Sequence, residues 1–185
     1  MLQGIDVSSH QSSFSTKGRA FVFVKATEGR SYINPQQIAQ AKQAREAGCV
    51  VGFYHFLWPG NITAQAEYFV EKCASRVEDL LAVDWEWTTD HSAASNAEKD
   101  SFIREVKRLR PQHRVLLYCS RDFWLTHDTT SFAGDGLWIA DYTVMGKPRI
   151  QADWIIHQYT SSPVDMNVAA FKSAAEMRGW ATALQ

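Results

Sequence analysis

The chain has 185 residues, of which 45% are hydrophobic and 12% aromatic, enough to bury the core of one domain spanning residues 1–185. Its net charge of −1 gives no electrostatic basis for binding nucleic acid or an acidic lipid surface. No apolar run approaches the ~20 residues that a membrane-spanning helix needs, which argues against membrane insertion. The opening "MLQGIDVSSH" lacks the pattern of a secretory signal, so we expect synthesis in the cytoplasm.

Eight β-rich runs follow one another along the chain, and most are apolar on both faces, as strands covered on both sides must be. They lie at residues 4–8, 20–26, 49–56, 80–87, 114–120, 137–142, 154–160 and 164–168. The three cysteines, Cys49, Cys73 and Cys119, are an odd number without metal-like spacing, and we expect them to be reduced.

Helical segments are predicted between several of these strands. The first spans 34–48, with Asn34 as N-cap, Pro35 in the first turn and Gly48 at its end. The second spans 61–76, and the third begins with a capping box of Ser95 and Glu98 and ends at Pro111. The apolar faces of the first two are Ile38, Ala41 and Ala44, then Ile62, Ala66, Phe69, Val70 and Cys73. The tail 169–185 could add a short helix with Phe171, Ala174 and Ala175 facing inward.

Strands that alternate with helices early in the chain, and have no room for helices late, predict an α/β fold. We expect a small irregular β/α barrel, because a regular eight-stranded β/α barrel needs about 250 residues. A doubly wound open sheet is the alternative. It would carry a glycine-rich phosphate loop after an early strand, and none is present.

The fourth predicted strand ends in two carboxylates, Asp84 and Glu86, set between Trp85 and Trp87. Residues i and i+2 of a strand face the same side, so both acids should point into the barrel mouth. Neighbouring carboxylates raise the proton affinity of one of them, which supplies an acid for glycosidic bond cleavage. The alternative is that both acids pair with Lys25 in a structural network.

Other kinds of site find less support. The six histidines lack His-Glu-x-x-His or similar spacing, and no serine lies in a Gly-x-Ser-x-Gly turn, so we expect no metal and no cofactor. The basic stretch 104–114 is interpreted as the solvated face of a helix.

Several stretches, in this order, resemble the glycoside hydrolase family 25 lysozymes, which are N-acetylmuramidases. They are "GIDVSSHQ" at 4–11, "FVFVKATEG" at 21–29, "AGCVVGFYHF" at 47–56, "AVDWEW" at 82–87, "VLLYCS" at 115–120, "LWIADY" at 137–142, and "WIIHQYT" followed by "VDMN". The resemblance implies a barrel of about five β/α units followed by three strands. It also implies hydrolysis of the β-1,4 bond after N-acetylmuramic acid in peptidoglycan.

Carried over by position, Glu86 resembles the family's proton donor, and Asp84, Asp6 and Asp165 resemble the acids around it. The positions that fall where the family lines its groove are Lys25, Glu28, Tyr54, Tyr118, Trp138, Tyr142 and Gln158. The chain departs from the family in its first loop, "SSFSTKG". It also has only "SSP" where the family has a glycine-rich hairpin, so one groove wall is expected to be lower.

The resemblance, with no signal segment or wall-binding domain in view, suggests a bacteriophage endolysin, a monomer made in the host cytoplasm that acts on the cell wall. A non-catalytic glycan-binding barrel and a chitinase-like glycosidase remain alternatives. Barrel closure should bring Asp6 and Asp165 side by side, opposite the fourth strand. We expect net retention, assisted by the substrate's acetamido group with Asp165 or Asp84 orienting it, rather than direct attack by Asp6.

Overall fold

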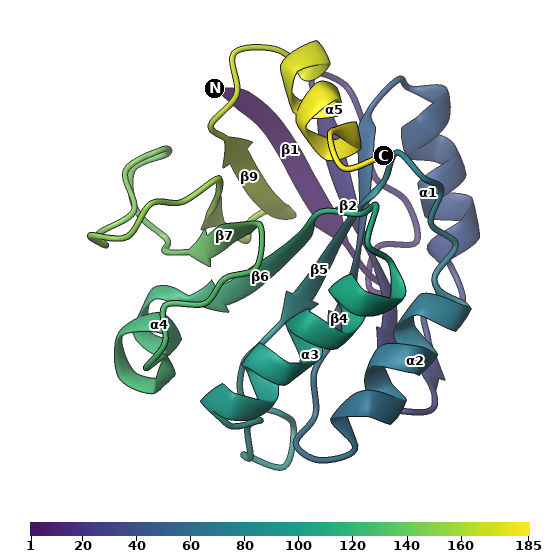
Figure 1. Ribbon diagram of the computed structural model, residues 1–185. Helices are drawn as coiled ribbons and strands as arrows, with labels where there is room; N and C mark the ends of the chain where they lie inside the picture. The colour runs from purple at the N-terminus through teal and green to yellow at the C-terminus, as the bar shows by residue number, and fades with distance from the viewer.

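The computed structural model describes residues 1–185 and contains one nine-stranded sheet and five helices (Figure 1). The sheet order is β1-β9-β8-β7-β6-β5-β4-β2-β3, and β1 also pairs with β2, so eight strands close into a barrel. The strands are β1 (Leu2–Val7), β2 (Phe21–Glu28), β3 (Tyr32–Ile33), β4 (Val50–Phe56), β5 (Leu80–Asp84), β6 (Val115–Ser120), β7 (Gly136–Ala140), β8 (Ile156–Thr160) and β9 (Asp165–Ala169).

One barrel strand runs against the others. From β1 through β8 the neighbouring barrel strands are parallel, whereas β9 is antiparallel to both β8 and β1. Residues 161–164 between β8 and β9 are too few for a parallel crossover, which needs a dozen or more residues, so they form a hairpin. As a result, β9 starts at the edge of the barrel where the parallel strands end.

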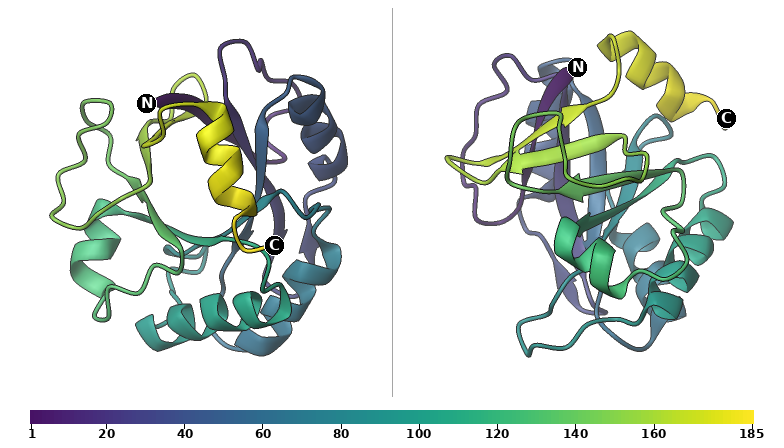
Figure 2. Two further views of the ribbon diagram at one scale, coloured as in Figure 1. Left: turned by 45° about the horizontal axis from the view of Figure 1, so that its top comes forward. Right: turned by 90° about the vertical axis from the view of Figure 1, so that its left-hand side faces the viewer.

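Four helices lie on the outside of the barrel, and the C-terminal helix lies across one of its ends (Figures 1 and 2). They are α1 (Gln37–Glu46), α2 (Ile62–Lys72), α3 (Asn96–Leu109), α4 (Arg121–His127) and α5 (Ala174–Thr182). No helix lies between β7 and β8 or between β8 and β9. The prediction of a small irregular barrel with few late helices is therefore confirmed. None of the five helices has the length and apolarity to cross a bilayer.

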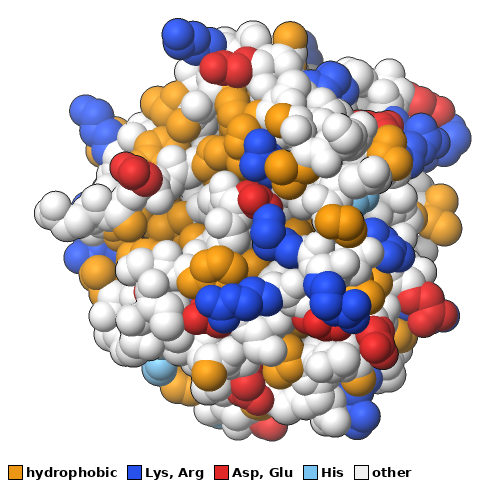
Figure 3. All heavy atoms as spheres, in the orientation of Figure 1, with side chains coloured by type: hydrophobic (Ala, Val, Ile, Leu, Met, Phe, Trp, Pro, Cys, Tyr) orange, Lys and Arg blue, Asp and Glu red, His pale blue; other side chains and the backbone are white.

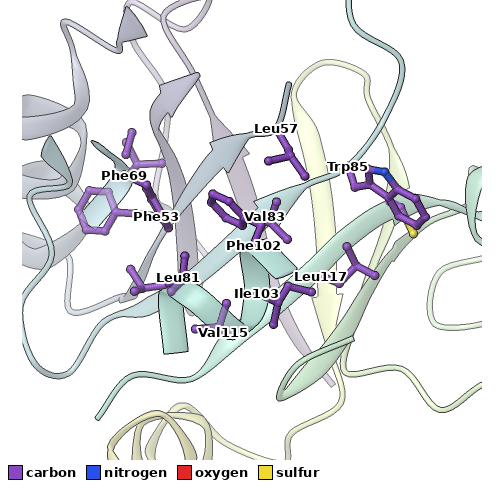
Figure 4. Packing of buried hydrophobic residues seen from close by; sticks show 14 of the residues in the cluster. Phe53, Leu57, Phe69, Leu81, Val83, Trp85, Phe102, Ile103, Val115 and Leu117 are labelled. Carbon is purple, nitrogen blue, oxygen red and sulfur yellow. The ribbon is translucent and has the colours of Figure 1, made fainter. Parts of the chain in front are cut away.

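Two hydrophobic layers stabilise the barrel. The outer layer of 27 buried residues packs between the strands and the helices, with Phe53, Phe69 and Phe102 among its members (Figure 4). The inner layer of 12 buried residues fills the barrel itself and includes Phe21 and Phe23. A Cβ at Gly4 would lie 2.4 Å from the Phe21 ring, and one at Gly52 would lie 2.3 Å from the Phe23 ring. These two glycines therefore make room for the rings inside the barrel.

The C-terminal helix closes the end of the barrel opposite the strand ends that carry acids. The inner layer includes Met177 and Ala181 of α5 together with Phe171, and Figure 2 shows α5 across the barrel opening. The predicted tail helix is present, but Ala175 is exposed, so the predicted inward face was wrong by part of a turn. Because this end is filled, substrate access is left to the opposite end, called the mouth below.

Other sequence expectations were corrected in detail. Helix α1 begins at Gln37 rather than after Asn34, because the Asn34 side chain accepts a hydrogen bond from Gln36 N in a turn before the helix. Ile38, placed on the buried face, is 72% exposed. The capping box of Ser95 and Glu98 is confirmed. Helix α4 was not predicted. The three cysteines are free, and basic and acidic side chains are interspersed over the face seen in Figure 3.

Candidate active site

Inward-facing side chains at the mouth form a cavity of about 220 Å³. The barrel fixes its composition, because alternate residues of each strand point inward and the last inward position on several strands is polar. Its lining residues are Asp6, Ser8, His10, Lys25, Tyr54, Phe56, Asp84, Glu86, Tyr118, Trp138 and Asp165. Four carboxyl groups from β1, from β5 and the residues after it, and from β9 therefore share one small space.

The last residue of β5 and the three residues after it place two acids in this cavity and two tryptophans outside it. The strand ends at Asp84 and not at Trp87 as predicted, although Trp85 N still donates to Tyr118 O at 2.9 Å. Trp85 is fully buried in the outer layer, where its indole N–H donates to Ala94 O at 2.8 Å (Figure 4). Trp87 is 54% exposed and packs on Phe123. The expected alternation thus holds beyond the end of the regular strand.

Asp84 is the deeper of the two acids. Burial raises the pKa of Asp84 well above its usual value, and the nearby Glu86 raises it further, while Lys25 acts in the opposite direction. Asp84 Oδ1 is buried and meets no hydrogen-bond donor from the protein, and Glu86 is close enough to share a proton with Asp84. A pair of acids in this environment retains a proton in solutions where a free carboxyl would have lost it.

Asp6 and Asp165 form a second acid pair across β1 and β9. The register opposes them directly, as expected from barrel closure. Burial raises the pKa of Asp6 well above its usual value, and the charge of Asp165 adds to this effect. Asp6 Oδ2 accepts hydrogen bonds from Gln158 Nε2 at 2.9 Å and Asn167 Nδ2 at 2.7 Å. These two bonds favour the ionised form of Asp6 and partly oppose the effect of burial.

Lys25 does not pair with the mouth acids. Its ammonium group contacts Glu28 Oε1 at 2.6 Å. Neither Asp84 nor Glu86 takes part in a salt bridge, so the alternative in which both acids pair with Lys25 is not supported. Glu28 Oε2 in turn accepts from Trp58 Nε1 at 3.0 Å. Glu28 lies outside the carboxylate cavity and lines a neighbouring hollow of about 650 Å³ between the β2–β3 turn and the segment after β4.

The remaining predicted groove residues divide between the wall and the interior. Tyr54, Tyr118 and Trp138 line the carboxylate cavity, whereas Tyr142 lines an adjoining hollow of about 360 Å³ with Glu86 and Tyr118. Gln158 is 1% exposed and lies behind Asp6, so it does not line the cavity. Burial and the neighbouring acids raise the pKa of Tyr54 and Tyr118, which keeps both phenols protonated and able to donate.

Four contributors to the mouth were not among the predicted site residues. Ser8, His10 and Phe56 line the cavity, and Asn167 hydrogen-bonds Asp6. The signal for Asn167 was present, because it stands two residues after Asp165 and thus on the same strand face. No three His, Cys, Asp or Glu side chains come together in a way that would hold a metal ion. Four carboxyl groups and two phenols are among the side chains that line the mouth.

The chain matches the model of a known protein family and is similar to proteins of known name. Residues 5–168 match the model of the family described as glycosyl hydrolases family 25. The autolytic lysozyme of Clostridium acetobutylicum is 31% identical over 87% of this chain and 51% of its own length. The lysozyme of Streptococcus phage Cp-7 is 27% identical over 93% of this chain and 54% of its own length.

The fold comparison covers the whole chain. A crystal structure of the bacterial lysozyme from Streptomyces coelicolor superposes with a TM-score of 0.86 at 28% identity, covering 100% of this chain and 98% of that one. The chain spans about half the length of the two curated relatives that it matches. Because the family model covers most of the chain and a relative above 30% identity spans 87% of it, the chain belongs to the glycosyl hydrolases family 25.

Proposed function

We propose that residues 1–185 form one catalytic unit, a muramidase that hydrolyses the β-1,4 bond between N-acetylmuramic acid and N-acetylglucosamine in bacterial peptidoglycan. The observation that carries this proposal is the pair of acids Asp84 and Glu86 in one cavity, with the pKa of Asp84 raised and no salt bridge on either acid. Family membership and the names of the relatives, both lysozymes, support the same activity.

Glu86 is the proton donor in this proposal. It lies nearer the solvent than Asp84 and lines both the carboxylate cavity and the adjoining hollow, so a sugar ring on either side of it would place the glycosidic oxygen within its reach. Asp84 lies deeper, and its raised pKa means that the two acids together retain a proton. Protonation of the leaving oxygen by Glu86 then begins bond cleavage.

Asp84 also orients the substrate's 2-acetamido group. Asp84 lines the cavity and its Oδ1 meets no protein donor, so the carboxyl group has an acceptor available for the acetamide N–H. The acetamide carbonyl oxygen then attacks the anomeric carbon from the face opposite the leaving oxygen. Water later breaks the new C–O bond from the face that the leaving oxygen occupied, so the two inversions retain the configuration. Asp6 is a poor candidate for direct attack, because Oδ2 already accepts two hydrogen bonds and burial favours its protonated form.

Substrate contacts come from the cavity wall and its two neighbours. Lys25, Tyr54, Tyr118 and Trp138 face the acids, Glu28 lines the hollow on one side, and Tyr142 lines the hollow on the other. Together these hollows would hold a glycan strand across the mouth. We propose that the barrel acts as a monomer at the bacterial cell wall, without membrane insertion or nucleic acid. A bacteriophage endolysin is the proposed origin, supported by the phage Cp-7 relative.

The experiment that tests the bond is mass spectrometry of purified peptidoglycan after digestion. We expect fragments that end in reducing N-acetylmuramic acid. Fragments that end in reducing N-acetylglucosamine, or stem peptides released without glycan cleavage, would contradict the muramidase assignment. Proton NMR of a soluble glycan fragment tests the stereochemistry. The first-formed product should be the β-anomer, and an initial α-anomer would refute retention.

A further inference from the structure

Two buried amides converge on one oxygen of Asp6. Gln158 on β8 and Asn167 on β9 oppose each other directly in the antiparallel register, and both side chains reach Asp6 Oδ2, at 2.9 Å and 2.7 Å. Both residues are almost fully buried, Gln158 at 1% and Asn167 at 0% exposure. Neither lines the cavity, so their contact with a substrate would have to pass through Asp6.

The orientation of both amides is fixed from behind. Trp138 Nε1 lies 2.7 Å from Asn167 Oδ1, and an indole N–H can only donate, so the Asn167 NH₂ group must face Asp6. The hydroxyls of Tyr118 and Tyr142 both donate to Gln158 Oε1, at 2.8 Å and 3.0 Å. With its carbonyl so occupied, Gln158 also turns its NH₂ group toward Asp6. Rotation of either amide would break at least two hydrogen bonds.

We infer that Gln158 and Asn167 are positioning residues that act through Asp6, holding Oδ2 as a hydrogen-bond acceptor so that Oδ1 is the oxygen left to face Asp165 and to take up a proton. Tyr118, Tyr142 and Trp138, expected from the family resemblance to touch the glycan, serve also to orient the two amides. This inference rests on the proposed muramidase function for its kinetic test but not for its titration test.

Several other groups face Asp6 or lie close enough to influence its titration. Asp165 on β9 is its direct partner. The charge of Asp6 also acts on Asp84, Tyr54 and Tyr118 from the three strands β5, β4 and β6, and on Tyr142 after β7. The remaining charged or titratable residues of the cavity are Lys25, Glu86 and His10. None of these residues is substituted in the variants below.

The kinetic test exchanges the Gln158 donor for a group whose donor capacity depends on pH. In Gln158→Glu the new carboxyl has the same length, repels Asp6 when it is ionised, and donates a hydrogen bond when it is protonated. We expect kcat to fall by roughly 10²-fold at pH 7 with KM little changed, and the ratio to wild type to recover as pH falls. Gln158→Met, which cannot donate at any pH, should not regain activity relative to wild type as the pH falls.

The matched control is Gln37→Glu, which places the same change at another buried amide, one that bonds Lys72 O and Ala74 N far from the mouth. It should lower the melting temperature without making kcat recover on acidification. If Gln158→Glu and Gln158→Met lose the same factor at every pH, the inference is wrong.

The titration test needs no activity. The ¹³C chemical shift of the Asp6 carboxyl is followed against pH in the wild type, in Gln158→Met and in Gln37→Glu. We expect the Asp6 midpoint to rise in Gln158→Met, because one donor that stabilises the ionised form is lost, and to stay at the wild-type value in Gln37→Glu. An unchanged midpoint in folded Gln158→Met would overturn the inference. A wild-type protein that releases no glycan fragments would refute the proposed function alone and leave this titration valid.

Discussion

Two buried clusters of carboxyl groups lie on opposite sides of the segment after β5. The acids of one cluster form salt bridges, and those of the other do not. On the outer side, Lys99 is fully buried between Asp100 at 2.6 Å and Asp128 at 2.8 Å, and it also donates to Phe132 O. Its ammonium group lies 5.1 Å from the Trp85 ring. On the inner side, Asp84 and Glu86 point into the mouth without any salt bridge. Trp85 lies between Asp84 and Glu86 in the sequence, and its ring contacts the Lys99 cluster.

The difference shows what each cluster is for. Around Lys99, each of the two acids contacts the ammonium group, so removing this cation would leave two buried charges uncompensated. At the mouth, burial and neighbouring acids raise the pKa of Asp84 and Asp6, and the cation Lys25 is held by Glu28. Buried acids without a cationic partner lower the stability of a fold, and such acids are found at functional sites, where a shifted pKa serves proton transfer. The outer cluster is therefore structural, and the inner one is the place for proton transfer.

The largest effect is expected from Glu86→Gln. The amide keeps the shape of the side chain but cannot donate an acidic proton, so clearance of a cell-wall suspension should slow by roughly 10²–10⁴-fold. The melting temperature should change little, because Glu86 is only half-buried and forms no salt bridge. Glu71→Gln, at a side chain that is 68% exposed, is the control and should clear the suspension at the wild-type rate. Near-normal clearance by well-folded Glu86→Gln would remove it from the mechanism.

The next largest effect is expected from Lys99→Met, which breaks the compensated cluster. Asp100 and Asp128 would remain buried without their cation, so the free energy of unfolding should fall by about 3–5 kcal/mol. Lys72→Met is the control, because the Lys72 side chain is 39% exposed and its pair with Glu71 is a surface pair worth about 0–1 kcal/mol. Urea denaturation followed by circular dichroism measures both. Equal, small losses in the two variants would refute the contrast between compensated and uncompensated acids.

The smallest effect is expected from one substitution made in each cluster, with opposite signs. Asp84→Asn removes an uncompensated buried acid and should raise the free energy of unfolding at pH 7 by about 0.5–2 kcal/mol while removing lytic activity. Asp100→Asn removes one of the two ion pairs of Lys99 and should lower the free energy of unfolding by about 1.5–3 kcal/mol. Thermal unfolding of both proteins at the same pH compares them. A loss of stability in both would mean that the mouth acids also support the fold.

The gain from Asp84→Asn should depend on pH. The pKa of Asp84 is raised in the fold above its usual value of 3.8, so the folded protein binds this proton more tightly than the unfolded chain. The resulting stability is fully present below pH 3.8 and is lost as the pH rises through the folded pKa. The advantage of Asp84→Asn over the wild type should therefore be larger at pH 7 than at pH 3.5. A difference that stays constant between these two pH values would contradict the raised pKa.

Much of the mouth could be predicted from the sequence. The period of two placed Asp84 and Glu86 on one side and Trp85 on the other, even though the regular strand ends at Asp84. The count of eight apolar runs predicted a closed barrel, and closure made the first and last barrel strands, which carry Asp6 and Asp165, neighbours. The pairing of Lys25 could not be decided in this way, because Glu28 and the mouth acids are all within the range of a flexible side chain.

What the sequence by itself determined is the local pattern: which residues are apolar, which acids share a strand face, and where helix α3 begins at its capping box. Only the tertiary structure decided the direction of β9, which brings its first residue, Asp165, to the mouth instead of its last. It also decided that Gln158 lies behind Asp6 and not in the groove. The physical reason is that strand periodicity fixes the side to which a residue points, whereas its partners are set by chain segments about 150 residues away, as between Asp6 and Gln158.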